Sequence, residues 1–342
     1  MAGQKILSVG VPCYNSAEYM DHCIQSLVDA ASDQRDIEII IVNDGSQKDN
    51  TAEKADEWVR RHPDMIVAVH QENGGHGAAV MAALERAQGR YFRVVDSDDW
   101  VDVPAMQRVL DRIRHFIRDD QCVDLIVSNY VYEHANDNAQ VCIHYRNTLP
   151  QNRIFTWEES ATFSLHENLL MHALTYRTEM VRSCNLPMPR HTFYVDNIYA
   201  YVPLPHVETL WYEDVDLYRY FIGREDQSVN ERVMLSRLDH QLRVTRIMID
   251  SYHIYDEVKS ERLQKYMVSY IAMIMAVSSI FCRMSDDPDA IPELKELWRH
   301  LEQFDKKMYR QCRTSFLGWG SNLPGKLSIP FYRVARHIFK FN

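Results

Sequence analysis

The sequence predicts an α/β protein whose sheet is mainly parallel and covered by helices on both faces. Short apolar runs of strand length alternate with segments of helical periodicity from residue 6 onward. The runs are almost continuously apolar, as strands are when a parallel sheet is buried on both faces. Each run ends in a cluster of polar residues, and ligands bind beyond the carboxyl ends of the strands in such sheets.

The predicted elements follow one another in a regular order. We expect the first strands at residues 6–11, 37–42, 65–70 and 91–95. Helices are expected at residues 20–31, 51–62, 78–87 and 104–118, where apolar residues recur at intervals of three and four. A looser set of strands (125–132, 141–145, 172–176, 209–212 and 215–222) and short helices (157–165 and 178–184) would complete the sheet. From about residue 232 to 313 the pattern is helical.

Composition excludes some classes of protein. The net charge of −10 argues against general binding to nucleic acids. Seven scattered cysteines without a C-x-x-C spacing fit reduced thiols, and the chain enters a strand pattern without a signal peptide, so we expect a cytoplasmic protein. The longest apolar run, residues 267–282, is short for a membrane span and predicts a buried helix.

The fourth predicted strand leads directly into three carboxylates, Asp96, Asp98 and Asp99. Carboxylates this close repel one another, and a hard divalent cation would keep them ionised. Mg²⁺ and Mn²⁺ prefer oxygen ligands and usually take one or two protein carboxylates, with phosphate oxygens and water completing the shell. The alternative is a solvated acidic turn.

The other polar clusters favour the metal and phosphate site over the acidic turn. They follow the first three predicted strands, at residues 14–15, 43–44 and 73–77. Because parallel strands end at one edge of a sheet, these loops and the carboxylates should converge there. Such convergence is a stronger signal than any single motif.

Four segments in this order and spacing resemble one known family. They are Val11-Pro12-Cys13-Tyr14-Asn15, Val42-Asn43-Asp44-Gly45-Ser46, Asn73-Gly74-Gly75-His76-Gly77 and Asp96-Ser97-Asp98-Asp99. The chain resembles the family 2 glycosyltransferases with the GT-A fold. The similarity extends through residues 194–197 and 218–220 to 223–228, and so covers about residues 5–230.

The resemblance implies an inverting transfer of a sugar from a UDP-sugar, or another nucleotide-diphosphate sugar, to a hydroxyl of a glycan or lipid-linked acceptor. Surface polysaccharide, capsule or cell-wall glycan synthesis is the expected setting, with Mn²⁺ or Mg²⁺ as cofactor. Residues 1–100 would be the nucleotide-sugar-binding half of the domain, 101–232 the acceptor-side half, and 233–342 a helical C-terminal region with a basic, aromatic tail.

The resemblance also assigns roles to individual residues. The implied donor-binding residues are Pro12, Tyr14, Asn15, Asp44, Asn73, Gly74, Gly75, Asp96, Ser97, Asp98, Arg224, Gln227 and Ser228. Asp96 and Asp98 are the implied metal site, with Asp98 as the direct ligand. Asp196 matches the position of the general base, which must be ionised at neutral pH.

Structural alternatives stay open for these residues. Asp44 and Asp196 could be turn or helix caps, and Asp99 could be a ligand or a helix cap. The glycine loop could be a plain turn, and residues 224–228 a surface loop. Glu213-Asp214 rivals Asp196 as the base, but a hairpin turn between two strands is its simpler interpretation. His76 and His206 could complete a metal site, although a lone histidine is more often a hydrogen-bonded or surface residue.

One departure from the family pattern concerns the helix after the glycine loop. Many relatives carry an asparagine or arginine in its first turns, where this chain has Ala79-Val80-Met81-Ala82.

The tail, residues 326–342, is basic and aromatic within an acidic chain. It could lie on an anionic membrane surface at the inner face of the cell membrane, dock on the domain, or join subunits of a homo-oligomer.

Two other functions compete with a glycosyltransferase. A sugar-nucleotide pyrophosphorylase uses a similar sheet, but its glycine-rich loop follows the first strand, where this chain has residues 12–15. A non-catalytic sugar-nucleotide-binding assembly protein would not need Asp44, Asp96, Asp98, Asp196 and Arg224 together.

Overall fold

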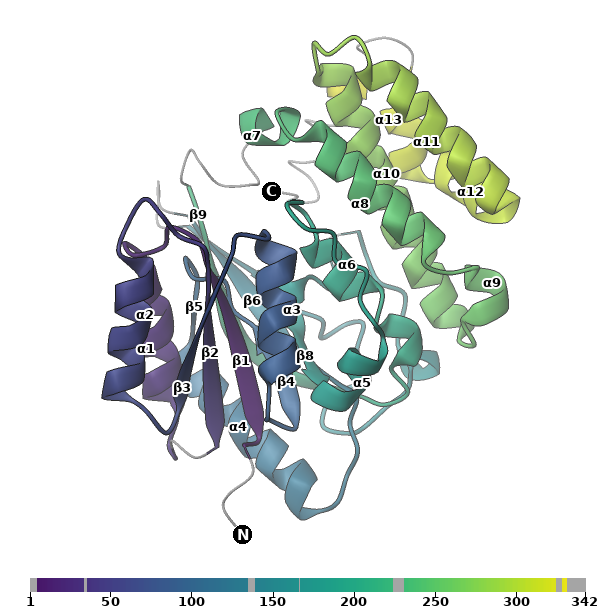
Figure 1. Ribbon diagram of the computed structural model, residues 1–342. Helices are drawn as coiled ribbons and strands as arrows, with labels where there is room; N and C mark the ends of the chain where they lie inside the picture. The colour runs from purple at the N-terminus through teal and green to yellow at the C-terminus, as the bar shows by residue number, and fades with distance from the viewer. Residues whose placement is uncertain are drawn as a thin grey trace. The chain divides into compact units, whose positions relative to one another are not determined.

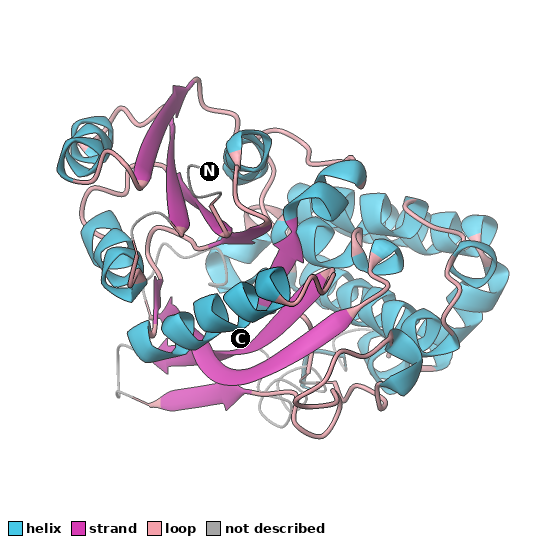
Figure 2. Cartoon of the chain, turned by 90° about the horizontal axis from the view of Figure 1, so that it is seen from below, coloured by secondary structure: helices cyan, strands magenta, loops and turns pink. Residues whose placement is uncertain are grey.

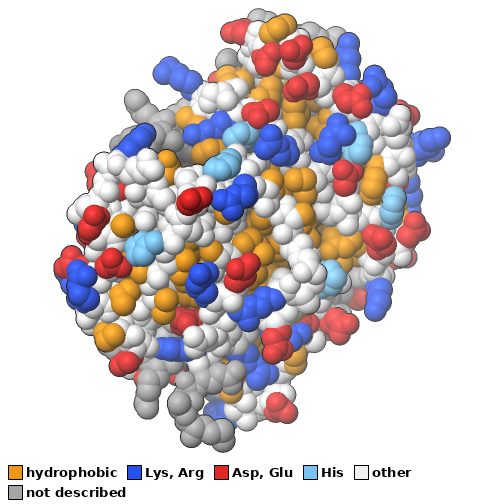
Figure 3. All heavy atoms as spheres, in the orientation of Figure 1, with side chains coloured by type: hydrophobic (Ala, Val, Ile, Leu, Met, Phe, Trp, Pro, Cys, Tyr) orange, Lys and Arg blue, Asp and Glu red, His pale blue; other side chains and the backbone are white. Residues whose placement is uncertain are grey.

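The computed structural model describes residues 5–33, 36–134, 139–165, 167–223, 231–323 and 328–330 (Figure 1). The chain divides into two compact units. The first comprises Met1–Glu159 and Leu169–Gly223, and the second comprises Ser160–Asn168 and Arg224–Asn342. On the face shown in Figure 3, acidic and basic side chains are intermingled.

A mixed sheet forms the centre of the first unit, with described strands in the order β3-β2-β1-β4-β8-β6-β9-β5 and β7 beside β6. Their bounds are β1 Leu7–Cys13, β2 Ile37–Asp44, β3 Ile66–Gln71, β4 Tyr91–Val94, β5 Trp100–Val101, β6 Leu125–His134, β7 Gln140–Ile143, β8 Leu174–Arg177 and β9 Leu210–Ile222. Strands β3, β2, β1 and β4 are parallel, with Leu7 opposite both Ile37 and Tyr91. The predicted α/β class is confirmed.

Helices cover both faces of this sheet, as Figure 2 shows. Their bounds are α1 Met20–Ala30, α2 Thr51–Arg61, α3 His76–Arg86, α4 Val103–Arg118, α5 Thr178–Ser183 and α6 Asp196–Tyr201, with 3₁₀ turns at Trp157–Glu159, Met171–Ala173 and Leu204–His206. The strand order reverses direction after β3, so a right-handed crossover places α3 on the face opposite α1 and α2 (Figure 1). Small residues let α3 approach closely: a Cβ at Gly10 of β1 would lie 2.8 Å from Ala83 Cβ.

The predicted hairpin turn at Glu213-Asp214 is wrong. Strand β9 runs through both residues beside β6, with its register shifted around Asn129. Glu213 is buried and accepts hydrogen bonds from Arg108 and Arg112 of α4 at 2.9 and 3.0 Å, so the helix neutralises its charge. A carboxylate that is paired in this way can be buried within a strand, so the two acidic residues do not have to lie in an exposed turn.

Two smaller expectations are also corrected. Only Trp157–Glu159 is helical in the segment predicted as a helix over 157–165. The strand expected at 172–176 begins at Leu174, because residues 171–173 form a 3₁₀ turn.

The second unit is a bundle of helices around α10. The bounds are α7 Glu231–Leu235, α8 Leu238–Asp250, α9 Ile254–Glu257, α10 Glu261–Met284, α11 Ala290–Phe304, α12 Lys306–Thr314 and α13 Phe316–Ser321. Helix α10 packs against α8, α11, α12 and α13. Within the described residues it is the one helix long and apolar enough to cross a membrane, but 72% of its most apolar window is buried in the protein. A core helix explains that composition, as predicted.

The segment Ser160–Asn168, which interrupts the first unit in sequence, also belongs to this bundle. The ring of Phe163 lies 4.3 Å from that of Tyr266 on α10, measured between centroids. Asn168 donates to the sulfur of Met273 on the same helix, 105 positions further along the chain. Residues 160–168 are therefore packed with helices that come much later in the sequence.

Candidate active site

The carboxyl ends of the parallel strands place the predicted site residues at one edge of the sheet. Cys13, at the end of β1, is level with Asn43 of β2, and Asn43 is level with His70 of β3. The loop after β4 joins them, since Ser97 Oγ donates to Ser16 Oγ across 2.9 Å. The loops that were predicted to converge therefore do so.

Asp44 holds the glycine loop in place. Its two carboxylate oxygens accept the amide N–H groups of Gly74 and Gly75 at 2.9 and 2.8 Å, and Gln71 adds a third donor at 2.7 Å. Asn73 donates to the Asp44 carbonyl at 3.1 Å. The loop is thus anchored by a buried carboxylate, and contact of Asp44 or Asn73 with a nucleoside stays a prediction.

In the loop after β1, Asn15 holds the backbone of a neighbouring loop and Tyr14 is exposed. Asn15 has a positive φ of 50°, and its side-chain oxygen accepts the N–H groups of Gln47 and Lys48 at 3.2 and 3.1 Å. Asn15 therefore ties this loop to the one after β2. The neighbouring Tyr14 is 52% exposed, so its ring offers a free face at the strand edge. Pro12 is buried within β1.

A segment that is distant in sequence lies over the glycine loop. The N–H of His191 donates to the Gly74 carbonyl at 2.7 Å. Gly75 has φ 84°, and a Cβ there would lie 2.9 Å from His191 N, so the contact requires glycine. A Cβ on Gly77 would meet the side chains of Met188 and Val195. This packing brings Asp196, the first residue of α6, to the site.

Asp96 and His76 form a pair at the centre of the site. His76 opens α3, and its Nε2 lies 2.7 Å from Asp96 Oδ1. Burial alone lowers the pKa of His76, but the carboxylates of Asp96 and Asp196 raise it above its ordinary value. Burial likewise raises the pKa of Asp96, and His76 outweighs it and holds that pKa low. Each partner thus favours the charged form of the other.

Asp196 interacts electrostatically with both His76 and Asp96. Burial raises the pKa of its carboxyl, His76 opposes the rise, and Asp96 adds to it. A carboxylate with a raised pKa is a stronger base than an ordinary aspartate. Asp98 also acts on this neighbourhood, because its charge contributes to raising the pKa of both His76 and Asp99.

Asp99 is neither exposed nor a helix cap. It is 1% exposed and accepts the hydroxyl of Tyr218 at 2.6 Å and the N–H of Phe221 at 2.9 Å. Burial and the neighbouring carboxylates raise its pKa well above the ordinary value. The cap of α4 is instead Asp102, which accepts the N–H of Ala105 at 3.0 Å.

His172 is a site residue that the sequence did not reveal. One of its ring nitrogens and carboxylate oxygens of Asp96 and Asp99 all lie within 4.8 Å of one another. The side chain is 5% exposed, its Nδ1 has no hydrogen-bond partner within the described residues, and burial lowers its pKa to about 4. His172 is therefore neutral at pH 7 and offers a lone pair.

The donor set fits a divalent cation. Carboxylate oxygens suit Mg²⁺ and Mn²⁺, and a neutral imidazole suits Mn²⁺ better than Mg²⁺. His172 lies at the start of an apolar strand pattern, where nothing in its spacing from Asp96 marks it as a partner. A histidine at the start of an apolar run was the only signal in the sequence.

The remaining predicted residues lie elsewhere. His206 lines a hollow beside Asp124 and Arg177. This hollow lies at the opposite ends of the strands from Asp96, so His206 is not near the predicted metal site. Arg224, Gln227 and Ser228 lie outside the described residues, as do 326–327 and 331–342 of the tail.

Comparison with known proteins identifies the family. Residues 8–173 match the family model described as glycosyl transferase family 2. A protein named as the glycosyltransferase EpsH of Bacillus subtilis is 30% identical over 215 residues, which are 58% of this chain and 60% of that protein. The poly(ribitol-phosphate) beta-glucosyltransferase of Bacillus spizizenii is 33% identical over 103 residues, 30% of this chain and 16% of that protein.

Solved structures show the same fold. S. aureus TarS, residues 1–349 in complex with UDP-GlcNAc, has a TM-score of 0.66 and 16% identity, and the likeness covers 96% of this chain and 92% of that one. The chain spans roughly half the length of the first curated relatives that it matches. The matched region includes the glycine loop, the carboxylates after β4 and His172. Residues 8–173 place this part of the chain in glycosyl transferase family 2.

Proposed function

We propose that the chain is an inverting glycosyltransferase. It moves a sugar from a UDP-sugar, or another nucleotide-diphosphate sugar, to a hydroxyl of a glycan or lipid-linked acceptor in surface-polysaccharide or cell-wall glycan synthesis. The observation that carries the proposal is the grouping of Asp96, His76 and Asp196 at the strand edge, beside the loop that Asp44 anchors. The family match and the printed activity of the ribitol-phosphate polymer relative support it.

Donor binding follows from the groups that the site presents. The exposed ring of Tyr14 provides a stacking face for the nucleoside. The N-terminus of α3, directly after the glycine loop, favours the negative charge of a diphosphate. UDP-GlcNAc is bound by TarS, which shares this fold, and it is a reasonable first donor to test.

Asp96 and Asp98 would hold the cation, and His172 and Asp99 are placed to complete the protein ligands. A bound Mn²⁺ or Mg²⁺ would neutralise negative charge on the departing diphosphate. The raised pKa of His76 favours a positive charge beside Asp96, and such a charge offsets part of the repulsion among the carboxylates.

Asp196 would act as the general base. An acceptor hydroxyl oxygen attacks the anomeric carbon, the bond from that carbon to the diphosphate oxygen breaks, and Asp196 takes the hydroxyl proton. Asp214 does not compete for this role, because Arg146 and Asn129 occupy its two carboxylate oxygens at 2.7 and 2.9 Å.

The family match favours this activity over a sugar-nucleotide pyrophosphorylase, whose glycine-rich loop would follow β1. A non-catalytic sugar-nucleotide-binding protein would have no use for a poised base at Asp196. Product analysis separates these alternatives, since a transferase releases the nucleoside diphosphate and a pyrophosphorylase releases pyrophosphate from a nucleoside triphosphate.

We further propose that the chain acts in the cytoplasm at the inner face of the cell membrane, through the basic, aromatic tail. The chain should float with vesicles that contain anionic lipid, and a chain that ends at residue 325 should not. Equal flotation of the two chains would contradict this role for the tail.

A thermal-shift screen tests the proposed donor class. A nucleotide-sugar that binds only the native state stabilises it and so raises the melting temperature. At a concentration 100-fold above its Kd, the free energy of unfolding rises by about 2.7 kcal/mol. The shift should require Mn²⁺ or Mg²⁺ and disappear with a chelator. If no nucleotide-sugar among UDP, dTDP and GDP donors shifts the melting temperature, the proposed donor site is wrong.

A further inference from the structure

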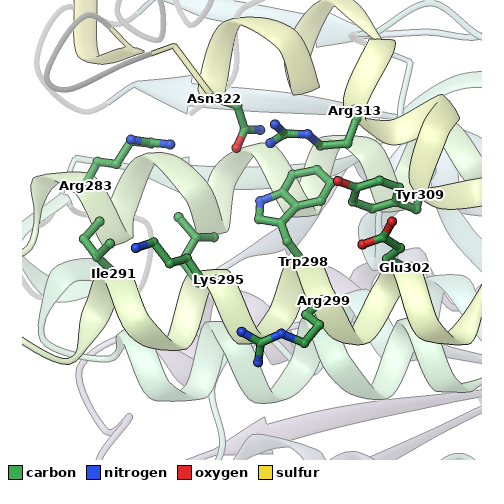
Figure 4. Close-up of a pocket in the computed structure, with 10 residues that line it drawn as sticks. Arg283, Ile291, Lys295, Trp298, Arg299, Glu302, Tyr309, Arg313 and Asn322 are labelled. Carbon is green, nitrogen blue, oxygen red and sulfur yellow. The ribbon is translucent and has the colours of Figure 1, made fainter. Parts of the chain in front are cut away.

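The helical unit contains a hollow of about 400 Å³ that the transferase chemistry does not use. It is an open hollow lined by α11 and α12, the end of α10 and the residue that follows α13 (Figure 4). The lining residues are Arg283, Ile291, Leu294, Lys295, Trp298, Arg299, Glu302, Tyr309, Arg313 and Asn322. All of them belong to the second unit, so the hollow is complete within it.

Positive charge dominates this hollow within an acidic chain. Arg283, Lys295 and Arg313 form no ion pair within the described part of the protein. The Nε of Arg283 is buried and has no hydrogen-bond partner there. Glu302 is the one carboxylate in the lining, and Figure 4 shows it at the opposite end from Arg283. A buried donor such as this Nε is costly to leave without a partner, and a bound anion would supply one.

The wall of the hollow positions Arg313. Trp298 is 8% exposed, and its indole N–H donates to Ser279 Oγ at 3.1 Å, which holds the ring. The guanidinium carbon of Arg313 lies 5.0 Å from the centre of that ring. Figure 4 shows the ends of Arg313 and Asn322 directed toward one another above the indole. Arg313 is thus positioned by a cation–π contact that leaves its N–H groups available.

We propose that this hollow binds a phosphate group carried on a small polar ligand. Two guanidinium groups and an ammonium match the charge of a phosphate better than that of a single carboxylate, and arginine binds phosphate oxygens through paired N–H donors. The amide of Asn322 supplies a further polar group. The volume leaves room beside the phosphate for a polyol or sugar.

The electrostatics of the hollow agree with an anionic occupant. Burial lowers the pKa of Arg283, and the positive charge of Arg313 lowers it further. A bound anion would oppose both causes of the lowered pKa. It would interact with the guanidinium in place of lost water and would offset the repulsion between the two positive charges. The proposal rests on the second unit alone and holds whether or not the first unit transfers sugar.

Binding of glycerol phosphate, measured calorimetrically with a chelator present, tests the proposal. The wild-type chain should bind it, and R283Q or R313Q should each weaken binding about tenfold or more, since each removes a charge-assisted hydrogen bond. Arg310 is the matched control, because it lies on the same helix as Arg313 but is exposed and outside the hollow. R310Q should bind as the wild type does, and E302Q should bind a few-fold more tightly.

Two further arms identify the source of the phosphate and exclude the donor site. Excess UDP should leave glycerol phosphate binding unchanged, whereas displacement by UDP would overturn the proposal.

If phosphatidylglycerol vesicles bind in place of glycerol phosphate, and R283Q and R313Q each weaken that binding while R310Q does not, the phosphate comes from a lipid headgroup. Absence of both kinds of binding, or equal weakening by R310Q and R313Q, would overturn it. Unchanged melting curves of the variants show that they are folded, and the gain expected for E302Q cannot arise from misfolding.

Discussion

Replacing Asp98 with alanine is expected to lower metal-dependent sugar transfer by about 10²–10³-fold, because a cation that stabilises the departing diphosphate contributes several kcal/mol. The charge of Asp98 contributes to raising the pKa of His76 and of Asp99, which places this carboxylate within the group. The measurement is the transfer rate over a series of Mn²⁺ concentrations. Higher Mn²⁺ should restore little of the lost rate.

Asp102→Ala is the matched control for Asp98→Ala. It removes a carboxylate from the same stretch of chain, but Asp102 caps α4 and pairs with Arg219 at 3.1 Å. Its loss should cost about 1 kcal/mol of stability, as loss of a helix cap does, and leave the Mn²⁺ dependence unchanged. If Asp98→Ala retained near-normal transfer at the same Mn²⁺ concentration, Asp98 would not be a metal ligand.

Replacing Asp196 with asparagine is expected to remove transfer while leaving donor binding intact. Loss of a general base lowers the rate by about 10²–10⁴-fold, and asparagine keeps the size and most hydrogen bonds of the side chain. The transfer rate and the donor-induced rise in melting temperature are measured on the same variant. A fall in both would instead indicate that Asp196 holds the donor.

Asp214→Asn separates the base from its rival in the sequence. Asp214 is held by Arg146 and Asn129 in β9, so its substitution should leave the transfer rate near that of the wild type. The acidic limb of the pH–rate profile gives a second test of Asp196. Because burial raises the pKa of this carboxyl, the rate should begin to fall at a pH above the ordinary aspartate value as the solution is acidified. Near-normal transfer by Asp196→Asn would show that another group is the base.

Much of the first unit could be predicted because its strands are buried on both faces. Residues 37–42 form a nearly continuous β-branched run that has no stable alternative to a central strand, and β2 is found there. Polar clusters at strand ends are then brought to one edge by parallel topology alone. Asp44, Asp96 and the glycine loop could therefore be grouped from the sequence, and Asp44 does contact Gly74 and Gly75.

Local patterns failed where a distant partner determines the structure. Glu213 and Asp214 resembled a turn because two charged residues interrupt an apolar run. Arg108 and Arg112 on α4 neutralise Glu213, and the strand continues. The segment after Trp157 is mostly not helical, since residues 160–168 pack with α10 and take their conformation from that contact.

By itself the sequence determined the α/β class and the edge of the sheet at which the carboxylates gather, because local periodicity indicates strand burial and parallel topology. The family was indicated separately, by the resemblance of the four motifs that follow the strands. Only the tertiary structure decided which groups meet there. His76 pairs with Asp96, His172 joins the carboxylates from the turn before β8, and the loop over Gly75 delivers Asp196. The nearest of these pairs in sequence, His76 and Asp96, is 20 positions apart, and a fold fixes such distances through packing that no short stretch of sequence records.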